Sequence, residues 1–278
     1  MARADGARAP VAESPDMREL IDLRRYPLDR PASAEWRTLV ERGRAAMAAE
    51  GVMVLDGFLT APALEAIRAD ARAAEPKAFF KPKSHNAYLM DQDPDLPADH
   101  PRNRLLRTDV ATIADDGIPA DSLIRPIYGW SGLRGFLAAV IGVERLYPYD
   151  DPLASINFNV GRPGAQLSWH LDAAEFTTTI MLQPAATGGA YEYVPFIRSE
   201  MDMAYDRVGR LLDGDRAGVR VLEQKGGTLV LFRGHHSIHR VTTIEGATTR
   251  NVAILSYDPQ PGRMLLEHAR RTFYGRPG

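Results

Sequence analysis

The spacing of apolar residues divides the chain into a helical front half and a strand-rich back half. Residues 33–50 place apolar side chains on one helical stripe before a glycine, which predicts a helix that ends there. Residues 51–58 (GVMVLDGF) predict a short strand that ends in a turn. A second helix is expected to begin after Thr60, and residues 131–141 predict a third.

Beyond residue 148 the apolar period changes to two, which is the period of a strand. The expected strands are residues 154–160, 165–172, 176–183, 190–194, 227–232, 239–244 and 250–257, with one helix inserted at 200–212. We therefore predict a mostly β fold with helical support (α+β). Its core would be a double-stranded β-helix, a cupin-like jelly roll, preceded by N-terminal helices.

The expected organisation is a flexible tail at residues 1–15 followed by a single domain at 16–278. In that domain a helical part extends to about residue 148, and the jelly roll occupies about 150–262. A C-terminal helix at about 263–275 could pack against a partner in a homodimer.

Prolines and aspartates interrupt any regular pattern between residues 77 and 129. A segment of this length is typical of an active-site lid, although a plain surface loop has the same composition.

Composition narrows the range of functions. The 278 residues carry a formal net charge of −2, so no phosphate-binding surface for nucleic acid is expected. The absence of cysteine excludes disulfides, thiolate metal sites and a cysteine nucleophile. Neither a membrane span nor a signal peptide is recognisable, so we expect a cytoplasmic protein that acts on a small molecule.

The sequence SWHLDAAEF brings two metal-ligand types together. His170 and Asp172 are two positions apart, so on a strand they face the same side. A second histidine from a distant strand would complete a set of two His and one carboxylate, which is typical of non-haem Fe(II) oxygenases. Alone, the pair is also compatible with a solvent-exposed strand.

Two predicted hairpins extend this site. If the turn GRPG joins 154–160 to 165–172 as a hairpin, Ser155 lies opposite His170. Asn157 then shares the face of His170, and this polar face either contacts solvent or lines a cavity.

The second predicted hairpin turns at residues 245–246 and places Arg250 opposite Val241, on the same face as His239. An arginine beside a metal-bound histidine is positioned to bind the far carboxylate of a dicarboxylate cofactor. A surface arginine on an edge strand is the alternative.

Residues 51–70 (GVMVLDGFLTAPALEAIRAD), the His170/Asp172 pair, His239 and Arg250 together resemble Fe(II)/2-oxoglutarate-dependent oxygenases of the phytanoyl-CoA-dioxygenase-like type. The stretches around the two histidines are most similar to the bacterial branch that hydroxylates or halogenates free amino acids. The resemblance covers about residues 50–262. It implies that His170, Asp172 and His239 bind Fe(II), that Arg250 binds 2-oxoglutarate, and that O2 is the co-substrate.

Position 172 distinguishes the two activities of that branch. Radical halogenases carry Gly or Ala there, which leaves a coordination site for chloride, whereas this chain has Asp172. The resemblance therefore implies hydroxylation of an unactivated C–H bond in a free amino acid or derivative, with release of succinate and CO2. His236 is a rival to His239, but only His239 is followed by Arg-Val and by an arginine at the expected distance.

Candidate substrate contacts come from the same comparison. Arg107 is similar in placement to an arginine that holds the substrate carboxylate, although a surface salt bridge is the alternative. Asp151 either receives a basic side chain or lies in a solvated turn. Asn157 is a candidate contact for 2-oxoglutarate or substrate, and Trp169 is expected in the core.

Two other classes of protein use the same metal ligands. A zinc-dependent hydrolase also accepts two His and one carboxylate, but it gives no reason for Arg250. A non-catalytic, cupin-like metal-binding sensor would keep the fold without turnover.

Overall fold

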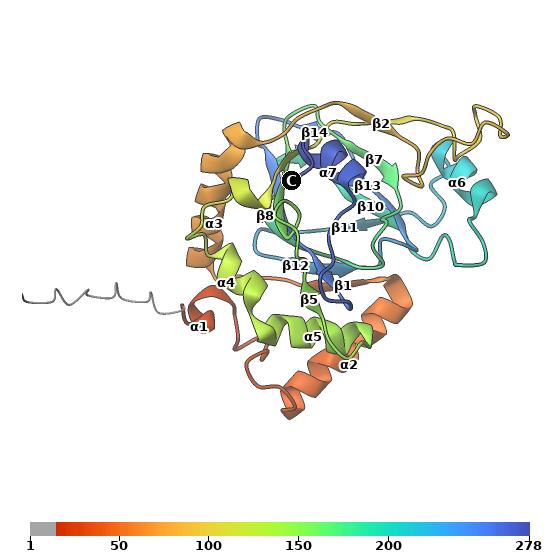
Figure 1. Cartoon of the computed structure of the whole chain (residues 1–278). Coiled ribbons are helices and arrows are strands. Elements are labelled where there is room, and N and C mark those ends of the chain that lie inside the picture. The colour runs from red at the N-terminus through yellow and green to blue at the C-terminus, as the bar shows by residue number, and fades with distance from the viewer. Residues whose placement is uncertain (1–14) are drawn as a thin grey trace, which may run out of the picture.

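The computed structural model describes residues 15–278, so residues 1–14 of the predicted tail lie outside the described residues. Two antiparallel sheets form the core, and helices pack on its outside (Figure 1). This arrangement is the predicted jelly roll with helical support.

The larger sheet has six strands, and the smaller sheet has four. In spatial order the larger contains β1 (Val52–Leu55), β12 (Leu229–Phe232), β8 (Thr177–Gln183), β15 (Arg250–Leu255), β6 (Ile156–Gly161) and β4 (Ala111–Ile113). The smaller contains β11 (Arg220–Leu222), β10 (Tyr191–Val194), β13 (Ile238–Val241) and β7 (Leu167–His170). Three short pairs flank them: β14 (Ile244–Glu245) with β9 (Thr187–Gly188), β16 (Tyr257–Asp258) with β5 (Tyr147–Pro148), and β2 (Lys83–His85) with β3 (Leu106–Thr108).

The helices confirm the boundaries that capping residues predicted. Ser33 accepts a hydrogen bond from the first turn of the second helix, and Gly51 ends that helix with a φ of 66°. Thr60 caps the third helix in the same way. The helices are α1 (Met17–Leu20), α2 (Ala34–Glu50), α3 (Ala61–Ala74), α4 (Ile124–Gly129), α5 (Ser131–Ile141), α6 (Tyr205–Leu212) and α7 (Glu267–Tyr274), with 3-10 turns η1 (Glu75–Lys77) and η2 (Asp115–Gly117).

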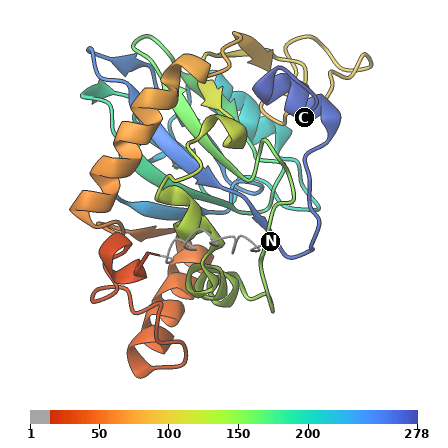
Figure 2. The ribbon, with the colours of Figure 1, turned by 60° about the vertical axis from the view of Figure 1, so that its left-hand side comes forward.

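Helices α2 and α5 lie side by side below the sheets in Figure 1, and α3 runs along the larger sheet in Figure 2. Apolar side chains from these helices and from the larger sheet form one core. Phe58, Phe136 and Phe158 are completely buried in it. The polar groups described below lie outside this apolar core, between the two sheets.

The inserted helix at 200–212 is shorter than predicted, because α6 begins at Tyr205. Ser199, which directly precedes the predicted helix, forms an isolated bridge with Asp202. Ala204 precedes the helix with a φ of 57° and makes no side-chain cap.

Both predicted hairpin registers are wrong. Strand β6 pairs with β15 and β4, whereas β7 pairs with β13 in the other sheet. Strands β13 and β15 are likewise in different sheets, so Arg250 lies opposite Gly161 instead of Val241. At each of these turns the chain passes from one sheet to the facing sheet. The alternation of apolar and polar residues predicts a strand but does not indicate to which sheet the strand belongs.

Candidate metal centre and pocket

Three side chains converge between the sheets. His170 and His239 are directly opposed on β7 and β13, and their ring centroids are 4.1 Å apart. Asp172 follows β7, and its Oδ1 lies 3.6 Å from Nε2 of His170 and 3.5 Å from Nε2 of His239. Their ligand atoms lie within 4.8 Å of one another, which is the spacing that a shared metal ion needs.

Backbone carbonyls orient both imidazoles. Nδ1 of His170 lies 2.9 Å from the carbonyl oxygen of Ser168, and Nδ1 of His239 lies 3.0 Å from that of Ser237. With Nδ1–H donating to these carbonyls, each ring presents Nε2 as a free lone pair toward Asp172. Burial, together with the nearby His239, lowers the pKa of His170, so its imidazole is neutral and ready to bind a metal.

The carboxylate of Asp172 is fixed by its neighbours. Thr177 Oγ1 donates a hydrogen bond of 2.7 Å to Oδ2, and the backbone N of Asp172 donates to the carbonyl of Gly234 at 3.0 Å. A Cβ at position 234 would overlap the carboxylate, so only glycine leaves room for Asp172 in this position. Oδ1 is thereby directed toward the two histidines.

Arg250 is a buried cation without an anionic partner among the described residues. Its side chain is almost fully covered, and Nη2 donates to Oε1 of Gln224 at 3.2 Å. Burial lowers the pKa of Arg250 to about 10, so the guanidinium still carries its charge at neutral pH. A buried, unpaired guanidinium is costly and therefore indicates a site for a bound anion.

Tyr191 connects Arg250 with the histidines, and sequence reasoning missed it. Its ring stacks on His239 at 5.5 Å and meets Phe232 edge to face at 5.5 Å. Burial raises the pKa of Tyr191, so its phenol is neutral. The negative charge of Asp172 raises this pKa further, and the positive charge of Arg250 lowers it. The only signal in the sequence is the alternation YEYV, which also describes an ordinary strand.

A pocket of about 300 Å³ opens beside the triad and includes His170 and Asp172 in its wall. Strand β6 contributes Asn157 and Asn159, and the C-terminal segment contributes Leu265, Phe273 and Tyr274. The remaining wall residues are His85, Leu89, Thr108, Val110, Thr112, Tyr149, Ala154, Leu167, Ala173, Ala174, Phe176, Thr177, Ile254, Leu255, Ser256 and Tyr257. The predicted polar face of the first hairpin therefore lines a cavity, although its strand pairing was wrong.

The structure places the predicted substrate residues differently. Arg107 has a side chain that is 71% exposed, pairs with Asp109 at 2.8 Å and is not in the pocket wall. The buried Asp151 carboxylate accepts hydrogen bonds from the backbone of Leu153, Ala154 and Leu265. Their binding to substrate stays a prediction that these contacts do not support.

Two further histidines, His236 and His85, and the tryptophan Trp169 lie near the triad in the sequence or in the fold. His236 lies 3.7 Å from the exposed Glu200 and is not part of the triad, so His239 is the histidine that joins His170. His85 lies in the pocket wall, with its ring 5.9 Å from that of His170. Trp169 is buried in an apolar cluster, as predicted.

The long segment at 77–129 is partly a pocket wall. Its residues on both sides of the proline-rich stretch, including Leu89 and Val110, line the pocket. The stretch between them is held by Asn103, whose side-chain amide donates to the carbonyls of Asp93, Leu96 and Pro97. Movement as a lid stays a prediction.

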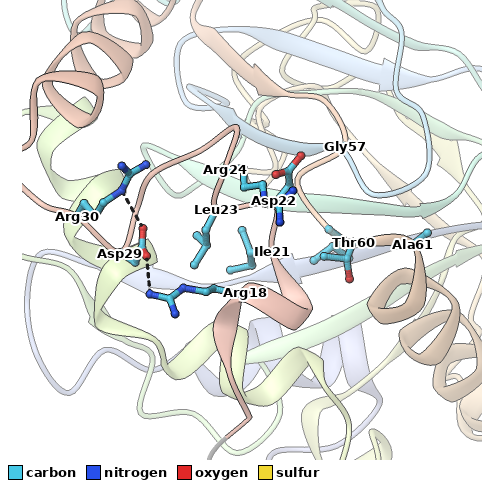
Figure 3. A pocket seen from close by; sticks show the side chains of 11 residues that line it. Arg18, Ile21, Asp22, Leu23, Arg24, Asp29, Arg30, Gly57, Thr60 and Ala61 are labelled. Atoms are coloured by element: carbon cyan, nitrogen blue, oxygen red, sulfur yellow. Dashed lines mark ion pairs between the residues drawn. The ribbon is translucent and has the colours of Figure 1, made fainter.

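A larger cavity of about 780 Å³ lies at the N-terminal side of the fold (Figure 3). Three of its charged groups are paired, because Arg18 and Arg30 both lie 3.6 Å from Asp29. It shares no wall residue with the pocket beside the triad, and none of the three candidate metal ligands lines it.

Comparisons with known proteins agree with this site. The sequence model of the family described as Halogenase D matches residues 36–263. A 2OG-Fe(II) oxygenase family protein from Burkholderia pseudomallei is 17% identical, with a TM-score of 0.50 over 80% of this chain and 91% of that one. The non-haem alpha-ketoglutarate-dependent carbocyclase SnoK from nogalamycin biosynthesis is 14% identical, with a TM-score of 0.56 over 80% and 85%. AviO1 from Streptomyces viridochromogenes Tue57 is 15% identical, with a TM-score of 0.54 over 83% and 97%.

No curated protein matches the chain. Among the described residues, none of the helices combines the length and apolar character that crossing a bilayer requires.

Proposed function

Because the chain belongs to the Halogenase D family of Fe(II)/2-oxoglutarate-dependent enzymes, we propose that it hydroxylates an unactivated C–H bond of a small molecule. The observation that carries this proposal is the set formed by the buried His170 and His239 and the half-buried carboxylate of Asp172. The substrate would bind in the adjoining pocket, next to two of these ligands.

The residues present fit both cofactors. Two neutral imidazoles and one carboxylate are a donor set suited to Fe(II) with exchangeable positions left over. Arg250 offers the buried positive charge that a dicarboxylic acid requires, and Tyr191 lies between it and His239. Once bound, Fe(II) and 2-oxoglutarate would supply the oxidising power for C–H cleavage, with succinate and CO2 as by-products.

The residues of the chain would position the reactants and exclude water. Arg250 and Tyr191 would hold the co-substrate at one end of the site, while the apolar pocket wall keeps the substrate beside the metal ligands. Thr177 and the carbonyls of Ser168 and Ser237 would keep the three ligand atoms directed at one point.

Asp172 favours hydroxylation over halogenation. In the halogenases that this sequence resembles, the loss of the carboxylate leaves a position for chloride. Here the carboxylate is present, is held by Thr177, and has its own space beside Gly234. We therefore assign the hydroxylase activity, although the family is described as Halogenase D.

Anaerobic addition of Fe(II) and 2-oxoglutarate to the purified chain tests the proposal. We expect a weak charge-transfer absorption band in the visible region that is lost in Asp172→Ala. Succinate should then form when O2 and a substrate are added, with the hydroxylated product detected by mass spectrometry. Absence of the band together with tight zinc binding would favour the hydrolase, and cofactor binding without turnover of any compound would favour the sensor. A chlorinated product in the presence of chloride would contradict the choice of hydroxylation.

A further inference from the structure

Among the residues whose side chains the structure describes, the wall of the substrate pocket contains no charged side chain other than the metal ligand Asp172. Aliphatic and aromatic groups make up most of it, and its other polar members are amides, hydroxyls and the imidazoles of His85 and His170. Burial raises the pKa values of Tyr149, Tyr257 and Tyr274, so these phenols stay neutral at neutral pH.

Three arginines next to the wall each have an acidic neighbour. Arg263 interacts with the phenol of Tyr149 and lies 3.6 Å from the carboxylate of Asp258. Arg233 lies over the ring of Phe176 at 5.0 Å and within 3.8 Å of the carboxylate of Glu175. Arg270 lies 3.8 Å from the buried carboxylate of Asp151. None of these three side chains lines the pocket, so a carboxylate there would lose its hydration without gaining a cationic partner from the described part of the wall.

Two amides on β6 supply the polar end of the pocket. Asn157 and Asn159 are two residues apart, so their side chains face the same side of the strand. Thr112 Oγ1 donates to Oδ1 of Asn159 at 3.4 Å, which leaves the NH2 of Asn159 as a donor. The side chain of Asn157 is mostly buried and makes no hydrogen bond to another described residue, and its amide atoms stay accessible from the pocket.

An amide that faces a pocket and has no protein partner is free to form its hydrogen bonds with a ligand. Asn157 has both a donor and an acceptor, so it matches a neutral group such as an amide, ester or alcohol. It cannot offset the charge of a carboxylate or an ammonium group.

From this wall and these amides we propose that the substrate is an uncharged, mainly apolar molecule whose polar group binds Asn157 and Asn159. The proposal rests on the proposed hydroxylase function and specifies its substrate class. It differs from the free amino acid that the resemblance implies, and it admits an amino-acid derivative only when both charges are blocked.

Paired test compounds separate these two substrate classes. L-Leucine and N-acetyl-L-leucinamide share a side chain but differ in charge, as do cyclohexylacetic acid and cyclohexylacetamide. Binding to the purified chain is measured by ligand-observed NMR without iron, and by the shift of the visible band in the anaerobic Fe(II)/2-oxoglutarate form. We expect the neutral member of each pair to bind at least tenfold more tightly. Equal or tighter binding of the charged members, or no binding of either neutral compound, overturns the proposal.

Two variants test whether this pocket sets the preference. Asn157→Ala should weaken binding of the neutral compounds about tenfold and leave the 2-oxoglutarate titration unchanged, whereas Gln260→Ala removes an exposed amide and should change neither. Val110→Arg places a cation in the wall and should give binding of cyclohexylacetic acid, in contrast to Val221→Arg on the exposed edge of β11. If Asn157→Ala instead weakens 2-oxoglutarate binding alone, Asn157 serves the co-substrate and the proposal fails.

The two readouts separate this proposal from the proposed function. Without the visible band, the iron-dependent function fails, while the NMR comparison in metal-free protein still decides the charge preference. With the band present and charged compounds preferred, the hydroxylase stands and only the substrate class is wrong.

Discussion

At the scale of single residues, the most demanding contact is the one between Gly234 and Asp172. Because a Cβ at position 234 would overlap the carboxylate, Gly234→Ala must displace Asp172 or the turn that carries residue 234. We expect Fe(II) affinity to fall roughly 10–100-fold, as for other losses of support around metal ligands. Competition with a chromogenic chelator measures the change.

A matched glycine controls for backbone effects. Gly135 lies on the exposed side of α5, and a Cβ added there would meet no other atom within 4 Å. Gly135→Ala should leave Fe(II) affinity unchanged and raise stability by about 0.5–1 kcal/mol. Equal Fe(II) affinity in both variants would show that position 234 tolerates a side chain.

Asp172 is the only anionic protein ligand of the triad. Asp172→Ala should abolish hydroxylation, because two imidazoles alone neither balance the charge of the ion nor complete the donor set. Thr177→Val removes only the hydrogen bond to Oδ2 and should retain part of the activity. Succinate formation over time compares the two, and wild-type turnover by Asp172→Ala would exclude Asp172 from the metal site.

Arg250 is expected to act on 2-oxoglutarate and not on the substrate. Arg250→Ala should weaken 2-oxoglutarate binding by about 2 kcal/mol or more, roughly thirtyfold, because the bound dicarboxylate would lose its buried partner. Arg250→Lys keeps the charge but loses the two-pronged geometry, so it should recover part of the loss. Titration of the visible band measures the effect, and an unchanged 2-oxoglutarate requirement in Arg250→Ala would contradict this role.

At the scale of elements, the sequence predicts local structure well and strand partners poorly. Helix α5 begins and ends where predicted, and its end is a local signal, because Gly142 after Ile141 adopts a φ of 81°. The pairing of β6 with β15 is not local, since it joins segments about ninety residues apart around a crossing between sheets. The predicted hairpin registers were wrong for that reason, while the alternation that puts Asn157 in the same cavity as His170 remained valid.

For the site, too, the sequence predicts local spacing but not contacts between distant strands. The spacing of His170 and Asp172 follows from strand geometry, and the resemblance adds His239 and Arg250. Tyr191 could not be found in this way, because its contact with His239 depends on the pairing of β10 with β13, two strands that are distant in the sequence. The absence of lysine and arginine from the described pocket wall likewise depends on how the chain folds, and the sequence pattern does not predict it.

The close approach of α2 and α5 depends on a second glycine. A Cβ at Gly43 would lie 2.8 Å from Sδ of Met53 and 2.9 Å from a methyl group of Val140. Gly43→Ala should therefore destabilise the protein by about 1–3 kcal/mol despite its better helix propensity. Chemical denaturation measures this, with Gly135→Ala again as the control; a stabilised Gly43→Ala would show that this packing relaxes freely.

At the scale of the whole molecule, the C-terminal segment completes the substrate pocket. Leu265, Phe273 and Tyr274 line the pocket, and Gly275 after α7 is packed closely against the ring of Phe79. The sequence led us to expect that this helix could pack on a partner subunit, whereas it contacts β4 of its own chain. Formation of a homodimer stays a prediction.

Asp151 connects the C-terminal segment with the chain just before β6 through hydrogen bonds to its carboxylate. Its carboxylate has no exposed surface and accepts hydrogen bonds from the backbone N of Leu153 and Ala154 through Oδ1, and from that of Leu265 through Oδ2. Each buried N–H that loses its acceptor costs about 1–3 kcal/mol. Loss of Asp151 should therefore release the chain after residue 262 before it unfolds the sheets.

Asp151→Ala tests this coupling of the chain end to the pocket. We expect faster hydrogen exchange in residues 263–278 and weaker binding of N-acetyl-L-leucinamide, while the Fe(II)/2-oxoglutarate band persists because no metal ligand is touched. Arg276→Ala, which removes the exposed ion pair with Asp116, should cost about 0–1 kcal/mol and leave binding unchanged. If Asp151→Ala instead abolishes binding of basic amino acids such as lysine and leaves exchange unaltered, Asp151 contacts the substrate directly, and the wall formed by the C-terminal segment has another anchor.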